Sequence, residues 1–178
     1  GGAEIWVATG TYKPSAYPRN LTGDIAFNDR DYSFHLIDSV KLYGGFSGTE
    51  TALEERGNLH ENETILSGDI DSTPTDSTDD VYHVVVAVNA LTGYIDGSTY
   101  RQATVIDGFT ITKGSPNGSG LMKIENQELP QSAGGGMVNM YSETEVNNIV
   151  FESNSAVKGG GMLVSQSKSY INNSIFDD

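Results

Sequence analysis

Four aspartates in the stretch SGDIDSTPTDSTDDVYH have the residue type and spacing for metal chemistry: Asp69, Asp71, Asp79 and Asp80. Asp69 and Asp71 are alternate residues, and alternate residues of an extended segment point to the same side. Two carboxylates on one side suit Ca²⁺, which prefers oxygen ligands. The four aspartates therefore form a candidate calcium site, although they do not follow the glycine and glutamate spacing of an EF-hand loop. The alternative is a solvated acidic loop.

The same carboxylates raise the question of catalysis. Polysaccharide lyases combine Ca²⁺ with a basic side chain, and glycoside hydrolases use two carboxylates as general acid and base. The candidate bases are Lys41 and Lys113 on predicted strands and Arg101 in a predicted loop, and the sequence singles out none of them. Of the hydrolase signatures, only the Asp79–Asp80 pair is present. The sequence therefore assigns no catalytic residue.

The histidines and short motifs add no further chemistry. The chain has three histidines, each isolated in the sequence, at positions 35, 60 and 83. His35 and His83 lie in strand-like runs, where a structural histidine is more common than a catalytic one. The sequence also contains no phosphate-binding loop, zinc-ligand spacing or nucleophile elbow.

Ligand binding without catalysis is the other possibility. Aromatic rings can stack on sugars, since the face of a ring attracts C–H groups. Trp6 alternates with Ile5 and Val7, so packing is an equally good interpretation of this residue. The insert 114–132 has an apolar centre, which predicts that it folds back on the domain or meets a partner. The aromatic candidates for sugar stacking are Trp6, Tyr12, Tyr17, Tyr94, Tyr100 and Tyr141.

A repeat of 25 residues indicates what positions these side chains. GGGM occurs twice, and Met137, Asn148 and Phe151 recur as Met162, Asn173 and Phe176. The apolar residues come in short runs rich in β-branched and aromatic side chains, which are typical of strands. A period between 20 and 50 residues marks a solenoid. The pattern predicts an all-β, right-handed parallel β-helix of about 24–25 residues per coil, with loop insertions.

One corner of the predicted coils can be followed along the chain. KLYG, ILSG and VIDG end at Gly44, Gly68 and Gly108, each with an apolar residue two positions before the glycine, and the next equivalents are Asn148 and Asn173. Glycine and asparagine enter the left-handed backbone conformation at the lowest cost. We therefore expect these five residues to stack in one corner of successive coils.

The repeat also predicts which side chains point inward. Phe109, Ile111, Ile149 and Phe151 alternate with outward residues such as Val150, so they should face the interior. Met137 should stack on Met162 as core, and Asn148 should stack on Asn173 in a hydrogen-bonded amide ladder.

One short surface helix is expected outside the coils. In TETALEERG, Thr51 is a candidate N-cap, Glu54 lies three residues on, and Gly57 is a stop signal.

Composition excludes several classes of protein. The 178 residues suffice for one domain, and no linker-like tract divides them, which predicts a single domain over 1–178. The formal net charge of −14 argues against nucleic-acid binding, which needs Lys and Arg. No apolar run reaches the length of a membrane span, and there is no cysteine for disulfides or thiol catalysis. The absence of an initiator Met and the last, broken repeat suggest a fragment of a longer protein, with further coils or a domain after residue 178.

The repeats resemble those of known exported proteins. GGGM with FESN (Phe151–Asn154) resembles the GGA(I/L) and FxxN repeats of polymorphic outer-membrane proteins. EIWVATGTYKP, YGGFSGTET and TVIDGFTITKG resemble pectin-lyase-like β-helix surface proteins common in Bacteroidetes. The resemblance implies a secreted, outer-membrane or cell-surface location. Because this fold carries unrelated functions, the resemblance does not decide activity.

Two functions follow as hypotheses. The first is a non-catalytic module for adhesion, binding an extracellular glycan or a host or cell-surface protein. The alternative is a carbohydrate-active enzyme, either a Ca²⁺-dependent polysaccharide lyase or a hydrolase. A basic side chain within about 8 Å of Asp69, Asp71, Asp79 or Asp80 is required for the lyase.

Overall fold

The protein is all-β and is built mainly from parallel sheets. A computed structural model describes residues 2–23, 26–73, 75–88 and 104–177. Within this part of the chain, regular structure consists of short strands and two single turns of 3₁₀-helix, η1 (Asp29–Asp31) and η2 (Leu53–Glu55). The prediction of an all-β protein is therefore confirmed.

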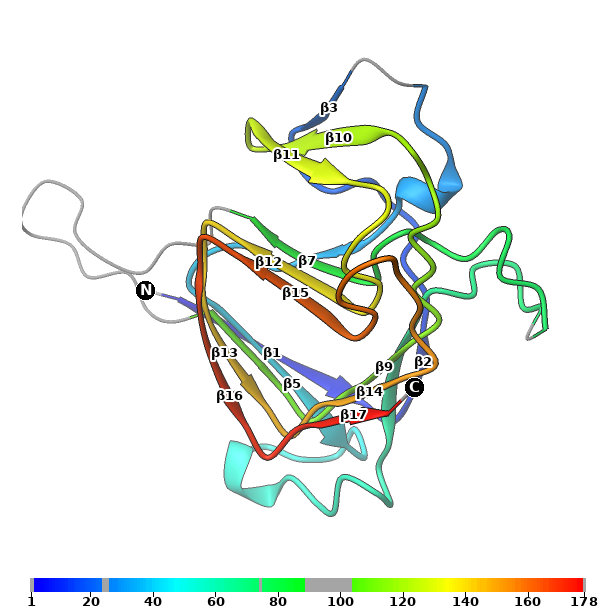
Figure 1. The fold of residues 1–178 in the computed structure, drawn as a ribbon. Coiled ribbons are helices and arrows are strands. Elements are labelled where there is room, and N and C mark those ends of the chain that lie inside the picture. Colours follow the sequence, from blue (N-terminus) through cyan, green and yellow to red (C-terminus); the bar gives the residue numbers. More distant parts are fainter. Residues whose placement is uncertain (1, 24–25, 74, 89–103, 178) are drawn as a thin grey trace, which may run out of the picture.

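Three parallel sheets take their strands from the chain in rotation. The first sheet contains, in spatial order, β1 (Ala3–Ala8), β5 (Val40–Phe46), β8 (Thr104–Asp107), β13 (Glu143–Asn147) and β16 (Lys168–Asn172). The second contains β2 (Gly10–Tyr12), β6 (Thr64–Ser67), β9 (Thr110–Thr112), β14 (Val150–Glu152) and β17 (Ile175–Asp177). The third contains β4 (Phe34–His35), β7 (Val85–Val88), β12 (Met137–Met140) and β15 (Met162–Ser165). Each sheet therefore gains one strand per layer, and the three sheets surround a common interior (Figure 1).

The repeat in the sequence is a register between neighbouring strands. Met137 pairs with Met162 between β12 and β15, and Phe151 pairs with Phe176 between β14 and β17. The predicted amide ladder is also present, because Asn173 Nδ2 donates to Asn148 Oδ1 over 2.6 Å. These contacts confirm that residues 25 positions apart lie directly over one another.

The first corner, between the first and second sheets, contains four of the five predicted residues. Tyr43 of β5 pairs with Asp107 of β8, which stacks Gly44 against Gly108; Asn148 and Asn173 continue the column. Gly108, Asn148 and Asn173 have φ values of 79°, 52° and 46°, in the left-handed region.

The prediction for Gly68 is wrong. This residue ends β6 in the second sheet, and its N–H donates to Thr112 O at the next corner. An apolar residue two positions before a glycine occurs in strands of both sheets, so the pattern alone does not distinguish the two corners.

The interior is apolar and follows the predicted alternation. Phe109, Ile111, Ile149 and Phe151 are all at most 2% exposed and belong to one core cluster with Val85, Ala87 and Met137 of the third sheet. Phe151 stacks on Phe176 with ring centroids 4.6 Å apart. Val150, which lies between Ile149 and Phe151 in the sequence and was expected to face outward, is half-buried. The prediction of the inward-facing residues is therefore confirmed.

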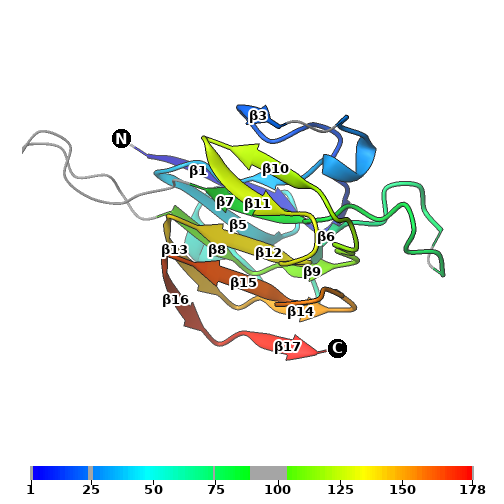
Figure 2. The same cartoon turned by 45° about the horizontal axis from the view of Figure 1, so that its top comes forward.

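The insert 114–132 covers the outer face of the third sheet. It forms the hairpin β10 (Leu121–Ile124) and β11 (Gln127–Pro130), and β3 (Leu21–Thr22) pairs with β10. Met122, Ile124 and Leu129 are fully buried in a second cluster, where they meet Val86, Val88, Val138 and Met140 of β7 and β12. Figure 2 shows the hairpin beside these strands. The prediction that the insert folds back on the domain is confirmed.

The expected surface helix is only the single 3₁₀ turn η2, and its cap differs from the prediction. Glu55, and not Glu54, reaches back and accepts hydrogen bonds from the N–H groups of Thr51 (2.7 Å) and Ala52 (3.3 Å). The turn spans three residues, too few for a repeating i to i−4 hydrogen-bond pattern.

Candidate functional site

The candidate site lies at the second corner, where the strands of the second sheet end. Gly68, Lys113 and Ser153 follow the last residues of β6, β9 and β14, which are aligned with one another. Lys113 and Ser153 have φ values of 65° and 52°, so two residues other than glycine hold the left-handed conformation. From this corner the chain crosses to the third sheet through loops, and those loops line a pocket.

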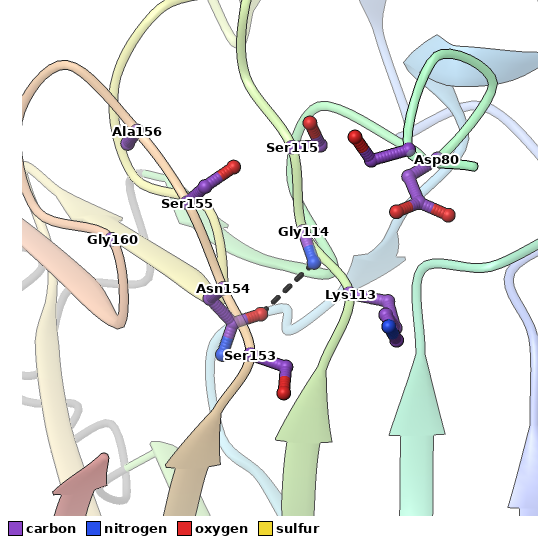
Figure 3. A pocket seen from close by; sticks show the side chains of 10 residues that line it. Asp80, Lys113, Gly114, Ser115, Ser153, Asn154, Ser155, Ala156 and Gly160 are labelled. Atoms are coloured by element: carbon purple, nitrogen blue, oxygen red, sulfur yellow. Dashed lines mark hydrogen bonds between the residues drawn. The ribbon is translucent and has the colours of Figure 1, made fainter. Parts of the chain in front are cut away.

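The pocket has a volume of about 540 Å³, and seven of its ten lining residues have polar side chains. In Figure 3, Asp80 and Lys113 lie on one side of Gly114, and Ser153 and Asn154 lie on the other. A volume of this size is within the usual range for small-molecule sites, about 300–1,000 Å³. The lining residues are Ser77, Asp80, Lys113, Gly114, Ser115, Ser153, Asn154, Ser155, Ala156 and Gly160.

Asp80 is the most perturbed group in the pocket wall. Its side chain is 2% exposed, and its Oδ1 atom has no hydrogen-bond partner within the described part of the chain. Burial raises the pKa of Asp80 to about 6, and the nearby charge of Asp69 adds to this effect, whereas Lys113 and Arg30 oppose it. Asp80 is therefore a buried acceptor that can change protonation state near neutral pH.

Arg30 holds two segments of the pocket wall together. Its Nε donates to Asp80 O over 2.7 Å, and its Nη2 donates to Ser115 O over 2.8 Å. The guanidinium also lies over the Tyr82 ring, 4.3 Å from the centroid. One side chain thus ties the backbone of Asp80 to that of Ser115.

Asn154 fixes the opposite wall. Its Oδ1 accepts a hydrogen bond from Gly114 N–H over 2.9 Å, and its Nδ2 donates to Ile111 O over 2.8 Å. Both contacts are buried, and both partners belong to the preceding layer. The asparagine of the FESN motif is therefore a buried backbone clamp between two layers.

The structure divides the four predicted calcium ligands into different environments. Asp69 Oδ1 accepts hydrogen bonds from the N–H groups of Ser72 (2.6 Å) and Thr73 (3.0 Å). Asp71 and Asp79 share a hydrogen bond that lowers the pKa of Asp71 and raises that of Asp79, and both line a different hollow from Asp80.

This division does not suit a calcium ion. Among the residues that the structure describes, no group of three or more His, Asp or Glu side chains is placed to hold a metal. Oδ1 of Asp69 accepts hydrogen bonds from its own loop, whereas Asp80 lines the pocket. Calcium binding by Asp69, Asp71, Asp79 and Asp80 stays a prediction, and it requires these carboxylates to be rearranged.

The basic residues also fall into distinct places. Lys113 lines the pocket with Asp80, whereas Lys41 Nζ lies 3.4 Å from Glu4 Oε1 on the first sheet. Arg101 lies outside the described residues. Lys13, which the sequence did not single out, brings its Nζ to 3.6 Å from Asp69 Oδ1. Lys13, which was not among the candidate bases, therefore meets the requirement that a lyase base lie within about 8 Å of one of the four aspartates.

Sequence reasoning missed Arg30 and the serines of the pocket, for different reasons. Arg30 lies in a loop 50 residues before Asp80, and no sequence pattern marks their contact. Ser153 could have been found from the sequence, because it directly follows an aligned strand end at a corner of the repeat, and Ser155 lies two residues further on.

The aromatic candidates mostly pack against the protein. Trp6 stacks on Phe46 with ring centroids 5.1 Å apart, and Tyr17 packs on Tyr32 at 4.8 Å. Tyr12 OH donates to Ala8 O, and Tyr141 packs against the cluster beneath the hairpin. Tyr94 and Tyr100 lie outside the described residues. Each of the four described candidates thus has an intramolecular partner.

The two histidines in strand-like runs are both in sheltered positions. His83 is 1% exposed, and its Nδ1 lies 2.9 Å from Gly134 O, which requires Nδ1 to donate. His35 Nδ1 accepts a hydrogen bond from Arg19 N–H, and burial lowers the pKa of His35. His60 is exposed. The contact with Gly134 gives His83 a structural role.

His83 makes stability depend on pH. Burial lowers the pKa of His83 to about 4, whereas a histidine in the unfolded chain has a pKa of about 6.5. As the pH falls, the unfolded chain binds a proton at His83 before the folded chain does. The neutral, buried His83 therefore contributes its full stability above about pH 6.5, and this contribution is lost as the pH falls towards 4. We expect His83→Gln to remove this loss, measured as the difference from wild type in urea unfolding at each pH. His60→Gln is the matched control and should follow wild type; identical profiles for all three proteins would contradict the prediction.

Comparisons with protein-family models, curated proteins and solved structures gave no significant match. Among the described residues, no helix has the length and apolar character needed to cross a bilayer. The candidate site is accordingly defined by its own geometry: a polar pocket at the second corner, with Asp80 and Lys113 on one side and Asn154 on the other.

Proposed function

We propose that the protein is a non-catalytic, right-handed parallel β-helix module of an exported surface protein, and that it binds an extracellular glycan or protein. The polar pocket at the second corner carries this proposal. It is formed by loops on a regular scaffold of parallel strands, which is the usual placement of a recognition site.

The rotation of the chain through the three sheets supports the β-helix. Successive strands enter the first, second and third sheets in the same order, and every neighbouring pair in these sheets is parallel. A crossover between parallel strands of one sheet is right-handed in about 98% of cases, since strand twist favours that hand. A right-handed coil of about 25 residues, with insertions in earlier coils, is consistent with the register.

The character of the pocket supports binding to polar groups. Serine hydroxyls both donate and accept hydrogen bonds, and the wall also presents one carboxylate and one ammonium group. The net charge of −14 disfavours a nucleic-acid ligand. The resemblance to Bacteroidetes surface proteins supports an extracellular or outer-membrane location and an adhesive role.

A glycan array tests this function. The purified protein should be applied at pH 7.5 with Ca²⁺ and with a chelator, after circular dichroism has shown that it is folded in both. We expect retention by a defined set of glycans in both conditions, because the four aspartates are not arranged around a metal. Binding only with Ca²⁺ would restore the predicted calcium site. No retention in either condition, together with no binding to cell-surface proteins, would instead indicate a structural stalk.

A carbohydrate-active enzyme is the second candidate, and two observations favour it. Lys13 Nζ lies 3.6 Å from Asp69 Oδ1, and the pKa of Asp80 is raised by burial to about 6, which suits a general acid. Incubation with acidic and neutral polysaccharides tests it: a lyase releases unsaturated uronates that absorb in the ultraviolet, and a hydrolase releases reducing ends. The binding module predicts neither product.

A further inference from the structure

We propose that the pocket at the second corner binds one neutral sugar residue, with a sugar hydroxyl donating to Asp80 Oδ1 and the serine hydroxyls of the wall contacting the ring. This inference rests on the proposed function and deepens it, since it names the ligand and the residues that recognise it.

The first argument is the unmatched oxygen of Asp80. A buried acceptor without a partner is unfavourable, and a ligand that supplies a donor removes that penalty. Asp80 is 2% exposed, its Oδ1 has less than 1 Å² of exposed area, and Arg30 holds its backbone carbonyl. Oδ1 therefore meets a ligand only when the carboxylate turns towards the pocket, and the ligand must carry an O–H or N–H group.

The second argument is charge. Asp80 is surrounded by Asp69 and Asp79, which disfavour an anionic ligand, and by Lys113 and Arg30, which disfavour a cationic ligand. The remaining wall is neutral, with hydroxyls from Ser77, Ser115, Ser153 and Ser155. A neutral polyhydroxyl ring matches such a lining because each of its hydroxyls both donates and accepts.

The third argument is the backbone of the corner. Lys113 and Ser153 hold positive φ values, whereas Gly68, at the aligned position one layer earlier, does not. A left-handed conformation is less favourable for a residue with a Cβ than for glycine. Both strained residues line the pocket, so the cost is retained where side chains face the ligand.

The Asp80 carboxylate gives the binding a defined dependence on pH. An ionised carboxylate accepts a hydroxyl hydrogen bond more strongly than a protonated one. Burial, with Asp69 and Asp79, raises the pKa of Asp80 to about 6 against the opposing effects of Lys113 and Arg30. Affinity should therefore be full at pH 7.5 and should fall as the pH is lowered through 6.

Titration with simple sugars followed by amide NMR tests the inference. The probes are the methyl glycosides of glucose, galactose, mannose and N-acetylglucosamine, with methyl glucuronide and methyl glucosaminide as charged counterparts. At least one neutral glycoside should shift the amides of Gly114, Ser115 and Ser155. Affinity should drop about tenfold in Asp80→Asn, because a hydrogen bond to a charged group is stronger than one to a neutral group. The charged counterparts should bind more weakly.

Matched variants separate the pocket from the rest of the protein. Asp76→Asn removes an exposed charge from the same loop outside the pocket and should leave affinity unchanged. Lys113→Asn keeps a residue that tolerates positive φ and tests the ammonium independently if Asp80→Asn does not fold. It should weaken the exclusion of the cationic glycoside.

The outcomes separate this inference from the proposed function. If the glycan array gives binding, but Asp80→Asn or a fall in pH to 5 leaves the affinity unchanged, the pocket assignment is overturned and the module remains a glycan-binding protein. If no glycoside shifts any amide and no glycan is retained on the array, the inference is overturned, and the proposed function is overturned with it when cell-surface proteins also fail to bind.

Discussion

Replacing Gly135 with alanine is expected to abolish stable folding. An ideal Cβ at this position would lie 2.7 Å from Gly160 O, 2.7 Å from Ser155 O and 2.9 Å from Gly114 O. All three are backbone oxygens, so no side-chain rotation can relieve the overlap. Separating the layers would break the hydrogen bonds from Gly135 N to Gly159 O and from Val84 N to Gly135 O.

The expected loss exceeds about 4 kcal/mol, a size usually reached only when a backbone or core contact cannot relax. Unfolding in urea measures it, and a variant without a cooperative transition agrees with the prediction. Gly57→Ala is the matched control: its Cβ would approach only Asn62 Nδ2, at 2.8 Å, in an exposed loop. That side chain can move, so the control should lose less than about 1 kcal/mol. Equal losses for the two variants would show that the glycines of GGGM are not required for close packing of layers.

Replacing Asn154 with alanine is expected to cost about 3 kcal/mol of unfolding free energy. Each of its two buried hydrogen bonds contributes about 1 kcal/mol, and the truncation leaves Gly114 N–H and Ile111 O without this partner. An unpaired buried group adds about 1–3 kcal/mol. The loss should appear in the urea midpoint and not in the slope of the transition, because the native state remains compact.

Asn172→Ala provides the comparison for Asn154→Ala. Asn172 Nδ2 donates to Asn147 Oδ1 over 2.9 Å on the exposed surface, so water can replace this bond. Its removal should cost no more than about 0.5 kcal/mol. Were Asn154→Ala as mild as this control, the asparagine of FESN would be a surface ladder residue and not an internal clamp.

Contacts between layers, such as those of Gly135 and Asn154, explain why the repeat could be predicted from the sequence alone. A layered structure places residues 25 positions apart in contact, so Met137 meets Met162 and Phe151 meets Phe176. Equivalent positions in successive layers therefore need the same kind of residue: a glycine, an inward aromatic residue or an amide. The resulting pattern is periodic in the sequence and predicts strands, faces and most of one corner.

The candidate site could not be predicted in this way, because most of its residues do not follow the repeat. Asp80 lies in a loop that does not repeat, and its approach to Lys113 depends on how that loop returns to the second corner. Sequence spacing grouped Asp80 with Asp71 and Asp79, whereas the fold turns Asp80 towards a different hollow. Lys13 reaches Asp69 from a segment more than 50 residues away, and nothing periodic connects them.

The amino-acid sequence by itself determined the all-β class, the strand faces, the stacking of Met137 on Met162 and the amide ladder through Asn148 and Asn173. Only the tertiary structure decided that Gly68 belongs to the second corner, that the insert 114–132 covers the third sheet, and that Asp80 and Lys113 line one pocket. The physical reason is the range of the interactions. Backbone pairing between adjacent layers repeats at a fixed interval along the chain, whereas burial and charge in the pocket arise where non-repeating loops meet in space.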